Sequence, residues 1–229
     1  MTDFESPAGR SLDRFADRFA AERLNMVNTQ LRQRGIRDER VLSAMAKVPR
    51  HEFIAEQYRP EAYEDHPIQI GEGQTISQPY IVARMLEALS LNLTDAILEV
   101  GTGSGYQTAL LAELSRRVYS VERHAPLAEH AKAILHRLGY RNIEISIADG
   151  SRGWQEKAPF DAIVVSAAAP EIPKLLVAQM SESGRMILPV GPSQYQELQL
   201  VEKQDGRTRI THLEPCRFVP LLGEQGYEN

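Results

Sequence analysis

Three glycines and one acid stand at spacings that suit the binding of a nucleoside. Gly101, Gly103 and Gly105 occupy every second position after the apolar run 97–100, and Glu122 follows 21 residues after the first of them. Glycine lets the backbone adopt positive φ and approach a ligand without an intervening Cβ. In open α/β sheets, an acid about 20 residues beyond such a loop binds the ribose hydroxyls. The pattern predicts a nucleoside site at the carboxyl end of a strand.

The spacing of the glycines narrows the kind of nucleoside. Gly-x-Gly-x-Gly is tighter than the Gly-x-Gly-x-x-Gly fingerprint, which is arranged around the pyrophosphate of a dinucleotide. A tighter loop suits a ligand without phosphates, such as S-adenosylmethionine, and disfavours a nicotinamide dehydrogenase. Glycine loops also occur as plain turns, but the flanking strand, helix and acid favour nucleoside binding.

Asp149 and Gly150 follow the third predicted strand, 142–147, at the same edge of the sheet. A carboxylate there can accept a hydrogen bond from the adenine amino group, and the glycine leaves room for the base. An Asp-Gly pair is also a common turn. Beside the glycine loop and Glu122, we favour the role in nucleoside binding.

The segment after the fourth predicted strand, 166–173, is small and apolar. Methyltransferases that act on amide or base nitrogens often carry Asn/Asp-Pro-Pro-Tyr/Phe at this position, which draws electron density onto a weak nucleophile. Because that motif is missing here, the expected methyl acceptor needs little activation.

A second candidate site lies at 75–79, directly before a helix that is expected to begin at Pro79. Helix capping explains these residues, because Ser77 or Gln78 can satisfy a free N–H and proline suits the first turn. Spacing alone therefore leaves capping ahead of catalysis.

Neither a metal site nor a hydrolase triad is expected. The six histidines lack the spacing of zinc ligands, and Cys216 is the only cysteine of the chain. Ser77 lacks the Gly-x-Ser-x-Gly elbow in which many serine hydrolases hold their nucleophile.

Alternating strands and helices define the expected core. Strands are predicted at 95–100, 117–122, 142–147, 160–166 and 185–190, and helices at 104–115, 125–138 and 171–180. This order is typical of an α/β fold with a Rossmann-like, doubly wound, mostly parallel sheet and helices on both faces.

Helical patterns also cover 11–34 and 38–47, so the fold begins with N-terminal helices. Residues 48–78 are expected to be irregular, and so long a loop in a compact domain is usually functional.

The C-terminal part changes character. Residues 198–202 alternate between apolar and polar, Asp205-Gly206 is a hairpin turn signal, and 208–212 is expected to be the returning antiparallel strand. The segment 218–222 is expected to form a last strand or an extended lid.

Composition limits the class of protein. A chain of 229 residues suits one α/β domain, and a net charge of −5 without a basic run makes nucleic acid an unlikely main substrate. We expect no membrane span, because no stretch of eighteen apolar residues occurs. The lone cysteine suits a reducing cytoplasm, where we expect the protein. We expect the protein to be a monomer.

Six segments together resemble the protein-L-isoaspartate O-methyltransferase family; they are 71–79, 98–107, 158–165, 167–173, 184–191 and 217–221. The segment 75–79 is much more specific to this family than the glycine loop is. Ala148 and Ser183 stand where related sequences usually carry glycine. Residues 1–22 precede the usual start of the family and are interpreted as a helical extension, and residues 23–229 as the methyltransferase domain.

The resemblance implies methyl transfer from S-adenosylmethionine to the free carboxylate of L-isoaspartyl residues in damaged proteins and peptides. The ester then closes to a succinimide, and hydrolysis returns part of it to aspartate. The residues that match the family's functional positions are Ser77 as the active-site serine; Thr75, Ile76 and Gln78 beside the substrate; Gly101, Thr102, Gly103, Ser104 and Gly105 around the methionine part of the donor; Glu122 at the ribose; and Asp149 with Gly150 at the adenine.

The chemistry of the acceptor agrees with this assignment. A carboxylate with a pKa near 4 is roughly a thousand-fold more ionised than protonated at pH 7, so it needs no general base. What the protein must supply is alignment, and we expect the Ser77 hydroxyl and nearby N–H groups to hold the acceptor. A methyltransferase of the same fold that acts on a small molecule, and a nucleoside-binding module without catalysis, are the alternatives.

Overall fold

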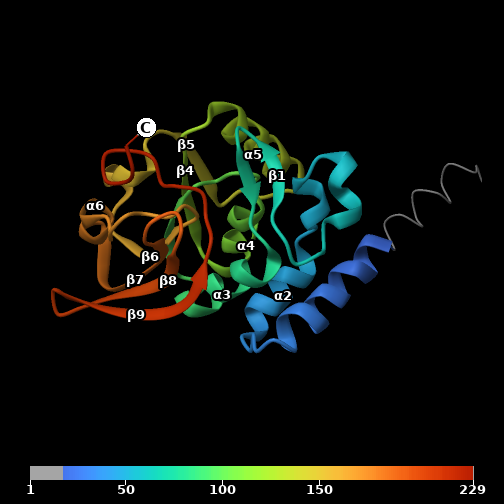
Figure 1. Cartoon of the computed structure of the whole chain (residues 1–229), viewed down its shortest axis with the longest axis horizontal. Coiled ribbons are helices and arrows are strands. Elements are labelled where there is room, and N and C mark those ends of the chain that lie inside the picture. Colours follow the sequence, from blue (N-terminus) through green and yellow to red (C-terminus); the bar gives the residue numbers. More distant parts are fainter. Residues whose placement is uncertain (1–17, 229) are drawn as a thin grey trace, which may run out of the picture.

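The chain is built on a seven-stranded sheet in the order β5-β4-β3-β6-β7-β8-β9 (Figure 1). The computed structural model describes residues 18–228. The strands are β3 (Ala96–Val100), β4 (Arg117–Glu122), β5 (Ile143–Ile147), β6 (Phe160–Val165), β7 (Met180–Val190), β8 (Gln196–Gln204) and β9 (Arg207–Cys216). Strands β3 to β7 run parallel, and β8 and β9 join them as an antiparallel hairpin. The expected doubly wound sheet with antiparallel C-terminal strands is confirmed.

The order of the strands reverses between β3 and β6. From β3 the chain adds β4 and β5 on one side, and it then crosses back to add β6 and β7 on the other. In open α/β sheets, ligands bind at such a switch point, outside the carboxyl ends of the strands. Gly101 and Ser166 are the first residues after these two strands.

Both faces of the sheet are covered, because alternate residues of each strand point to opposite sides. Ile97 packs into a core that includes Leu42, Leu86 and Leu110. These residues come from α2 (Glu39–Lys47), α3 (Pro79–Leu89) and α4 (Tyr106–Leu114). Leu98 belongs to a second core, together with Leu176 of α6 (Lys174–Ala178).

The expected elements of the central sheet agree closely with the structure. Strands β3 to β6 and helices α4 and α5 (Ala125–Arg137) begin and end within two residues of the expected bounds. The exceptions are α6, which is shorter than 171–180, and β7, which begins five residues before 185. Pro173 disfavours helical backbone in the residue before it, and pairing with Phe160 draws Met180 into the sheet.

Ser183 in β7 has φ 66°, a left-handed conformation that favours glycine. Glycine adopts this conformation without strain, which is a physical reason for the glycine that related sequences carry at this position. Ala148 is not among the non-glycine residues with positive φ.

Residues 48–78 contain more regular structure than expected. They form 3₁₀-helices η2 (Arg50–Phe53) and η3 (Glu56–Glu61) and the two-stranded hairpin of β1 (Ile68–Gly71) and β2 (Gln74–Ile76). Both turn residues, Glu72 and Gly73, have positive φ, as a type I′ turn requires. The expectation of an irregular loop was wrong here, because Glu-Gly is not the usual sequence of such a turn.

The N-terminal region packs against this loop. A helix over 18–25 continues into the π-helix η1 (Met26–Arg32), so the helical pattern at 11–34 is confirmed from residue 18 onward, and its earlier part lies outside the described residues. The ring of Phe19 stacks on His51, with centroids 4.2 Å apart. Because the helix is continuous from residue 18 to Arg32, it runs through the boundary expected between the extension 1–22 and the methyltransferase domain. None of the helices within 18–228 is long and apolar enough to span a bilayer.

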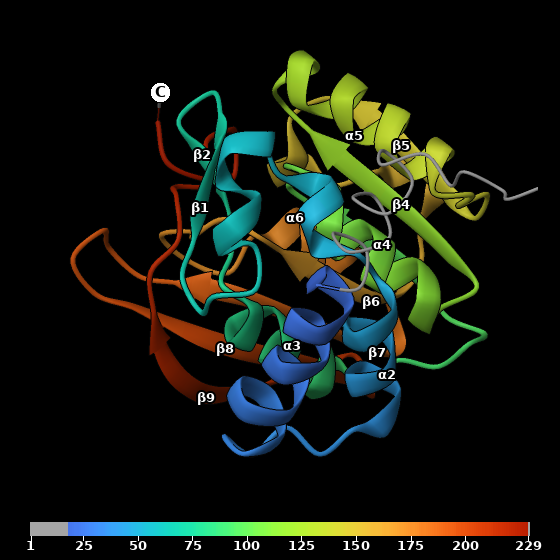
Figure 2. The ribbon, with the colours of Figure 1, turned by 90° about the vertical axis from the view of Figure 1, so that its right-hand side faces the viewer.

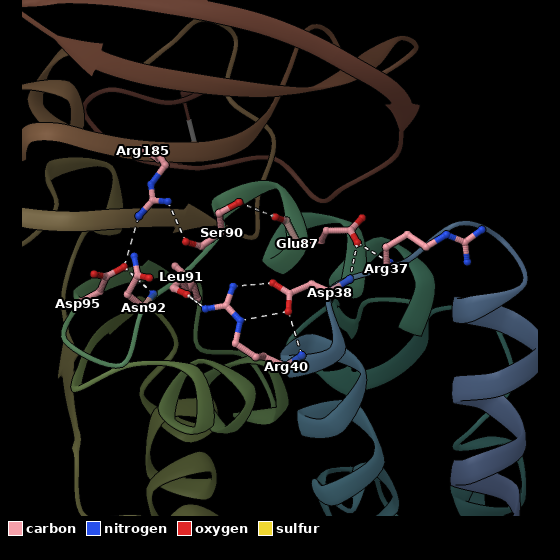
Figure 3. Close-up of polar contacts among 9 residues, drawn as sticks. All are labelled: Arg37, Asp38, Arg40, Glu87, Ser90, Leu91, Asn92, Asp95 and Arg185. Atoms are coloured by element: carbon pink, nitrogen blue, oxygen red, sulfur yellow. Dashed lines mark hydrogen bonds and ion pairs between the residues drawn. The ribbon is translucent and has the colours of Figure 1, made fainter.

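A network of hydrogen bonds and ion pairs lies at the end of the sheet opposite the glycine loop; Figure 3 shows its residues. The Glu87 Oε1 atom accepts hydrogen bonds from the backbone N–H groups of Arg37 (2.6 Å) and Asp38 (3.0 Å). Arg185 of β7 donates to the Ser90 carbonyl at 2.8 Å and pairs with the largely buried Asp95. The network joins α2, α3 and the sheet.

Replacement of Glu87 by alanine should lower the free energy of unfolding by roughly 2 kcal/mol, because it removes charge-assisted hydrogen bonds to two backbone donors. Chemical denaturation of both proteins measures the difference. Glu39→Ala is the matched control, since Glu39 pairs with Arg32 at the surface and such pairs contribute less than about 1 kcal/mol. Equal losses for the two variants would contradict this role of Glu87.

Candidate functional site

A cleft lies at the switch point, above the carboxyl ends of β3, β4 and β6. The segments that line it are 74–77, 100–104, 106–107, 121–124, 166–167 and 219–222, together with Val82 and Gly150. Figure 2 shows the β1–β2 hairpin rising beside the C-terminal segment at this end of the molecule. Chain segments that are distant in the sequence thus enclose one site.

The glycine loop forms the floor of the cleft. Gly101 has φ 93°, and a Cβ added there would lie 3.4 Å from the Cβ of Ser166. A Cβ at Gly105 would lie 3.1 Å from Ala131 of α5. Larger residues would therefore strain the backbone and bring the loop against its neighbours. Gly101, Thr102, Gly103 and Ser104 line the cleft, whereas Gly105 is not a lining residue and packs towards α5.

Glu122 ends β4 and turns its carboxylate towards the loop. Its Oε2 accepts from the Gly103 N–H and its Oε1 from the His124 N–H, each at 2.9 Å. A carboxylate offers about four acceptor positions, so capacity remains for further donors such as ribose hydroxyls. The side chain is buried and lines the cleft, in agreement with the expected position.

Asp149 and Gly150 differ in position. Gly150 lines the cleft, and a Cβ there would lie 2.6 Å from Val100 Cγ1. Asp149 is not a lining residue, and its carboxylate accepts from Ser151 N (2.9 Å), Ser151 Oγ (2.7 Å) and Glu224 N (2.9 Å). Burial acts to raise the pKa of Asp149, but these hydrogen bonds outweigh burial and hold the pKa below its usual value. Its contact with adenine stays a prediction.

The C-terminal segment is held against the sheet. Tyr227 donates from its N–H to the Leu221 carbonyl (2.7 Å) and from its hydroxyl to the Gly191 carbonyl (2.6 Å). Pro220 forms an isolated β-bridge with Ala168. The segment 218–222 is therefore extended without forming a full strand, and its residues 219–222 line the cleft.

The segment 75–79 does not cap α3 with its own side chains. Gln78 occupies the N-cap position without a side-chain hydrogen bond, and the Tyr80 N–H instead donates to Asp65 Oδ1 at 2.9 Å. The capping interpretation of Ser77 and Gln78 was therefore wrong. No hydrogen bond joins the Ser77 hydroxyl to any other residue within 18–228, which leaves it available to a ligand.

A second cleft adjoins the first. It is lined by Pro67, Thr75, Ser77, Gln78, Ile81, Ser166, Ser193 and 215–220. Thr75, Ser77 and Ser166 line both clefts, together with Val219 and Pro220. Ile76 lines only the first cleft and Gln78 only the second. The two clefts thus meet at Ser77.

Glu99 is a buried acid next to the site that the sequence analysis missed, and it lines neither cleft. Its Oε2 accepts from Thr108 Oγ1 (2.6 Å) and Ser120 Oγ (2.7 Å), and Ser120 Oγ lies 2.5 Å from Thr102 Oγ1. The network therefore anchors the glycine loop from below. Burial raises the pKa of the Glu99 carboxyl to about 7, and its Oε1 has no partner among the described residues. The available signal was an acid inside the apolar run of β3.

Within residues 18–228, no group of three or more histidine, cysteine, aspartate or glutamate side chains is placed to hold a metal ion.

Comparison with known proteins shows a consistent likeness. A family model described as Protein-L-isoaspartate(D-aspartate) O-methyltransferase matches residues 22–226. A protein-L-isoaspartate O-methyltransferase of Koribacter versatilis is 57% identical over 209 residues, which cover 91% of this chain and 94% of that protein. The protein of the same name from Syntrophus aciditrophicus is 51% identical over 214 residues, 92% of this chain and 98% of the relative.

Solved structures agree. A protein-L-isoaspartate O-methyltransferase superposes with a TM-score of 0.80 at 30% identity, over 89% of this chain and 67% of the other. A putative protein-L-isoaspartate O-methyltransferase from Plasmodium falciparum, in complex with S-adenosyl-L-homocysteine, superposes with a TM-score of 0.77 at 30% identity, over 87% of this chain and 98% of the other.

The raised pKa of Glu99 predicts a pH dependence of stability. The folded protein holds this proton up to about pH 7, whereas the unfolded chain releases it near pH 4.5, so stability falls as the pH rises between these values. The loss is complete above about pH 7 and amounts to roughly 3 kcal/mol.

Glu99→Gln should remove this loss, so the variant should gain stability relative to the wild type between pH 5 and pH 8. Denaturant unfolding at both pH values measures the change, and Glu129→Gln at an exposed position of α5 is the control for the substitution itself. A stability difference between Glu99→Gln and wild type that is the same at both pH values would contradict the assignment.

Proposed function

The chain belongs to the protein-L-isoaspartate(D-aspartate) O-methyltransferase family, and we propose that its two clefts hold the two partners of the methyl transfer. The enzyme transfers a methyl group from S-adenosylmethionine to the free carboxylate of L-isoaspartyl residues in damaged proteins and peptides, which initiates repair through a succinimide. In this proposal the first cleft holds the methyl donor and the second holds the peptide.

The residues of the first cleft fit a nucleoside. Gly101 and Gly150 line this cleft, and Val100 and Val121 add an apolar surface for a base. Glu122 has free acceptor capacity for hydroxyl donors. When bound, S-adenosylmethionine supplies an electrophilic methyl group on its sulfonium. We propose that Gly101–Gly105 surround its methionine part and that Gly150, with Asp149 at the edge, borders the adenine.

The meeting of the two clefts at Ser77 is the observation that carries the assignment of the acceptor. Ser77 lines both clefts, and Asp65 takes over the capping of α3, so the Ser77 hydroxyl is free to donate. Thr75, Ile76 and Gln78 surround it on the same segment. We propose that this segment holds the isoaspartyl carboxylate with hydrogen bonds from Ser77 and from backbone N–H groups.

The proposed role of Ser77 is positioning and not nucleophilic attack. The acceptor carboxylate is already ionised at neutral pH, so no residue has to remove a proton from it. Holding two reactants in line can lower the barrier by ~7–11 kcal/mol. A hydroxyl that donates to one carboxylate oxygen fixes the anion and leaves the other oxygen free to react.

We further propose that the enzyme acts as a cytoplasmic monomer on protein acceptors and not on nucleic acid. Its single cysteine suits a reducing compartment, and its net charge of −5 disfavours polyanions. The large apolar side chains most exposed within 18–228 are Leu24, Leu93, Ile147, Tyr195 and Ile210, which come from separate elements. Residues 1–22 are proposed to be an extension that precedes the methyltransferase domain.

Ser77→Ala should lower kcat for isoaspartyl peptides by about 10-fold or more, with nearly unchanged affinity for S-adenosylmethionine. The assay uses labelled S-adenosylmethionine and two peptides that differ only in aspartate or isoaspartate, and the wild type should label the isoaspartyl peptide alone. Ser181→Ala is the control, since this half-buried serine lines neither cleft. Unchanged turnover in Ser77→Ala would rule out the proposed role, and labelling of neither peptide by the wild type would rule out the substrate.

Glu122→Ala should weaken the binding of S-adenosylmethionine by about 10- to 100-fold, as expected from loss of a buried hydrogen bond to a charged group worth ~1.5–3 kcal/mol. Calorimetry on the protein without peptide measures the affinity. Glu122→Gln retains the shape and tests the charge, and Glu129→Ala on the surface of α5 is the control. Wild-type affinity in Glu122→Ala would remove this residue from the ribose site.

A further inference from the structure

Ser166 is a second hydroxyl at the junction of the two clefts. It is the first residue after β6, and it lines the first cleft as well as the second, as Ser77 does. The two serines come from different parts of the fold, because Ser77 stands between β2 and α3. The role of Ser166 is not explained by the binding of a nucleoside to the glycine loop.

The backbone of Ser166 is fixed at the switch point. Its N–H donates to the Val100 carbonyl at 2.9 Å, which joins the end of β6 to the end of β3. Its Cβ lies 3.4 Å from the position that a Cβ of Gly101 would take. The sheet therefore fixes the Cα and Cβ atoms of Ser166 beside Gly101.

The hydroxyl oxygen of Ser166 accepts a hydrogen bond whose direction is known. Gln107, in the first turn of α4, donates from Nε2 to Ser166 Oγ at 2.7 Å. An amide N–H can only donate, so the serine oxygen is the acceptor in this bond and its own proton must point elsewhere. No acceptor among residues 18–228 takes that proton, and the side chain is only half-buried between two clefts.

We propose that Ser166 donates this proton to the acceptor carboxylate, as a second substrate-binding hydroxyl beside Ser77, and that Gln107 is the positioning residue that sets its direction. A carboxylate is an acceptor only, and hydrogen bonds to a charged oxygen are stronger than neutral ones. Two hydroxyl donors on different elements fix the orientation of the anion better than one. The inference rests on the proposed function of Ser77 and of the second cleft.

Ser166→Ala should lower kcat/KM for an isoaspartyl peptide by about 10- to 100-fold and leave the affinity for S-adenosylmethionine, measured by calorimetry without peptide, within twofold of the wild type. Ser166→Thr, which keeps the hydroxyl, should restore most of the activity. Ser181→Ala is the matched control, since Ser181 is also half-buried and hydrogen-bonded to a side chain, that of Asp161.

Gln107→Leu tests the positioning role with Ser166 in place. It should lower kcat/KM for the peptide, and the double variant Ser166→Ala with Gln107→Leu should be no worse than Ser166→Ala alone, because both changes remove the same donor. Additive losses, or equal losses in peptide activity and in affinity for S-adenosylmethionine, would overturn the inference. The latter result would mean that Ser166 serves the methyl donor.

The variants also separate this inference from the function of Ser77. Wild-type kcat/KM in Ser166→Ala beside a defective Ser77→Ala would overturn the role of Ser166 alone. Wild-type kcat/KM in both would overturn both. If Ser166→Ala does not fold, the comparison of Ser166→Thr with Gln107→Leu decides, since the inference requires activity in the first and a loss in the second.

Discussion

The hydrogen bond from the Ser166 N–H to the Val100 carbonyl, 2.9 Å long, joins the ends of β6 and β3 where the order of strands reverses. At the same place the Gly101 N–H donates to the Val121 carbonyl at 2.8 Å, which ties β3 to β4. These bonds bring three strand ends together and satisfy backbone groups that would otherwise be buried without partners. The glycine loop, Glu122 and Ser166 all leave the sheet from this point, so their separation is determined by the strand spacing.

The second half of the site has a different physical origin. Ser77 belongs to no strand of the large sheet and is positioned by the loop 48–78. Arg50 is fully buried within this loop; its Nε donates to the Ala62 carbonyl at 2.8 Å, and its guanidinium lies 5.0 Å from the ring centroid of Tyr106. Burial lowers the pKa of Arg50 to about 10. The charged Arg50 thus links the segment 48–78 to α4, the helix that follows the glycine loop. Removing its guanidinium from water costs free energy of desolvation.

The sequence predicts those features whose causes are local. The strands β3 to β6 are apolar runs bounded by turn residues, and Glu122 lies at a fixed distance from the glycines, so periodicity and spacing were sufficient. The capping of α3 by Asp65 depends on a residue 15 positions earlier, and the partners of Asp149 include Glu224, 75 positions later. The β1–β2 hairpin has a turn without the usual Asn-Gly, and the partners of Glu99 come from α4 and β4. Such long-range contacts leave no local pattern, which is why spacing alone favoured capping at Ser77 and gave no sign of the bonds that hold Asp149.

The bonds that hold Tyr227 to Leu221 and Gly191 have a practical consequence for handling the protein. Leu221 lines the first cleft, and Tyr227 lies only two residues from the end of the chain. A fusion that displaces Tyr227 would therefore release the lining segment 219–222 and alter the shape of the first cleft, although Tyr227 itself lines neither cleft.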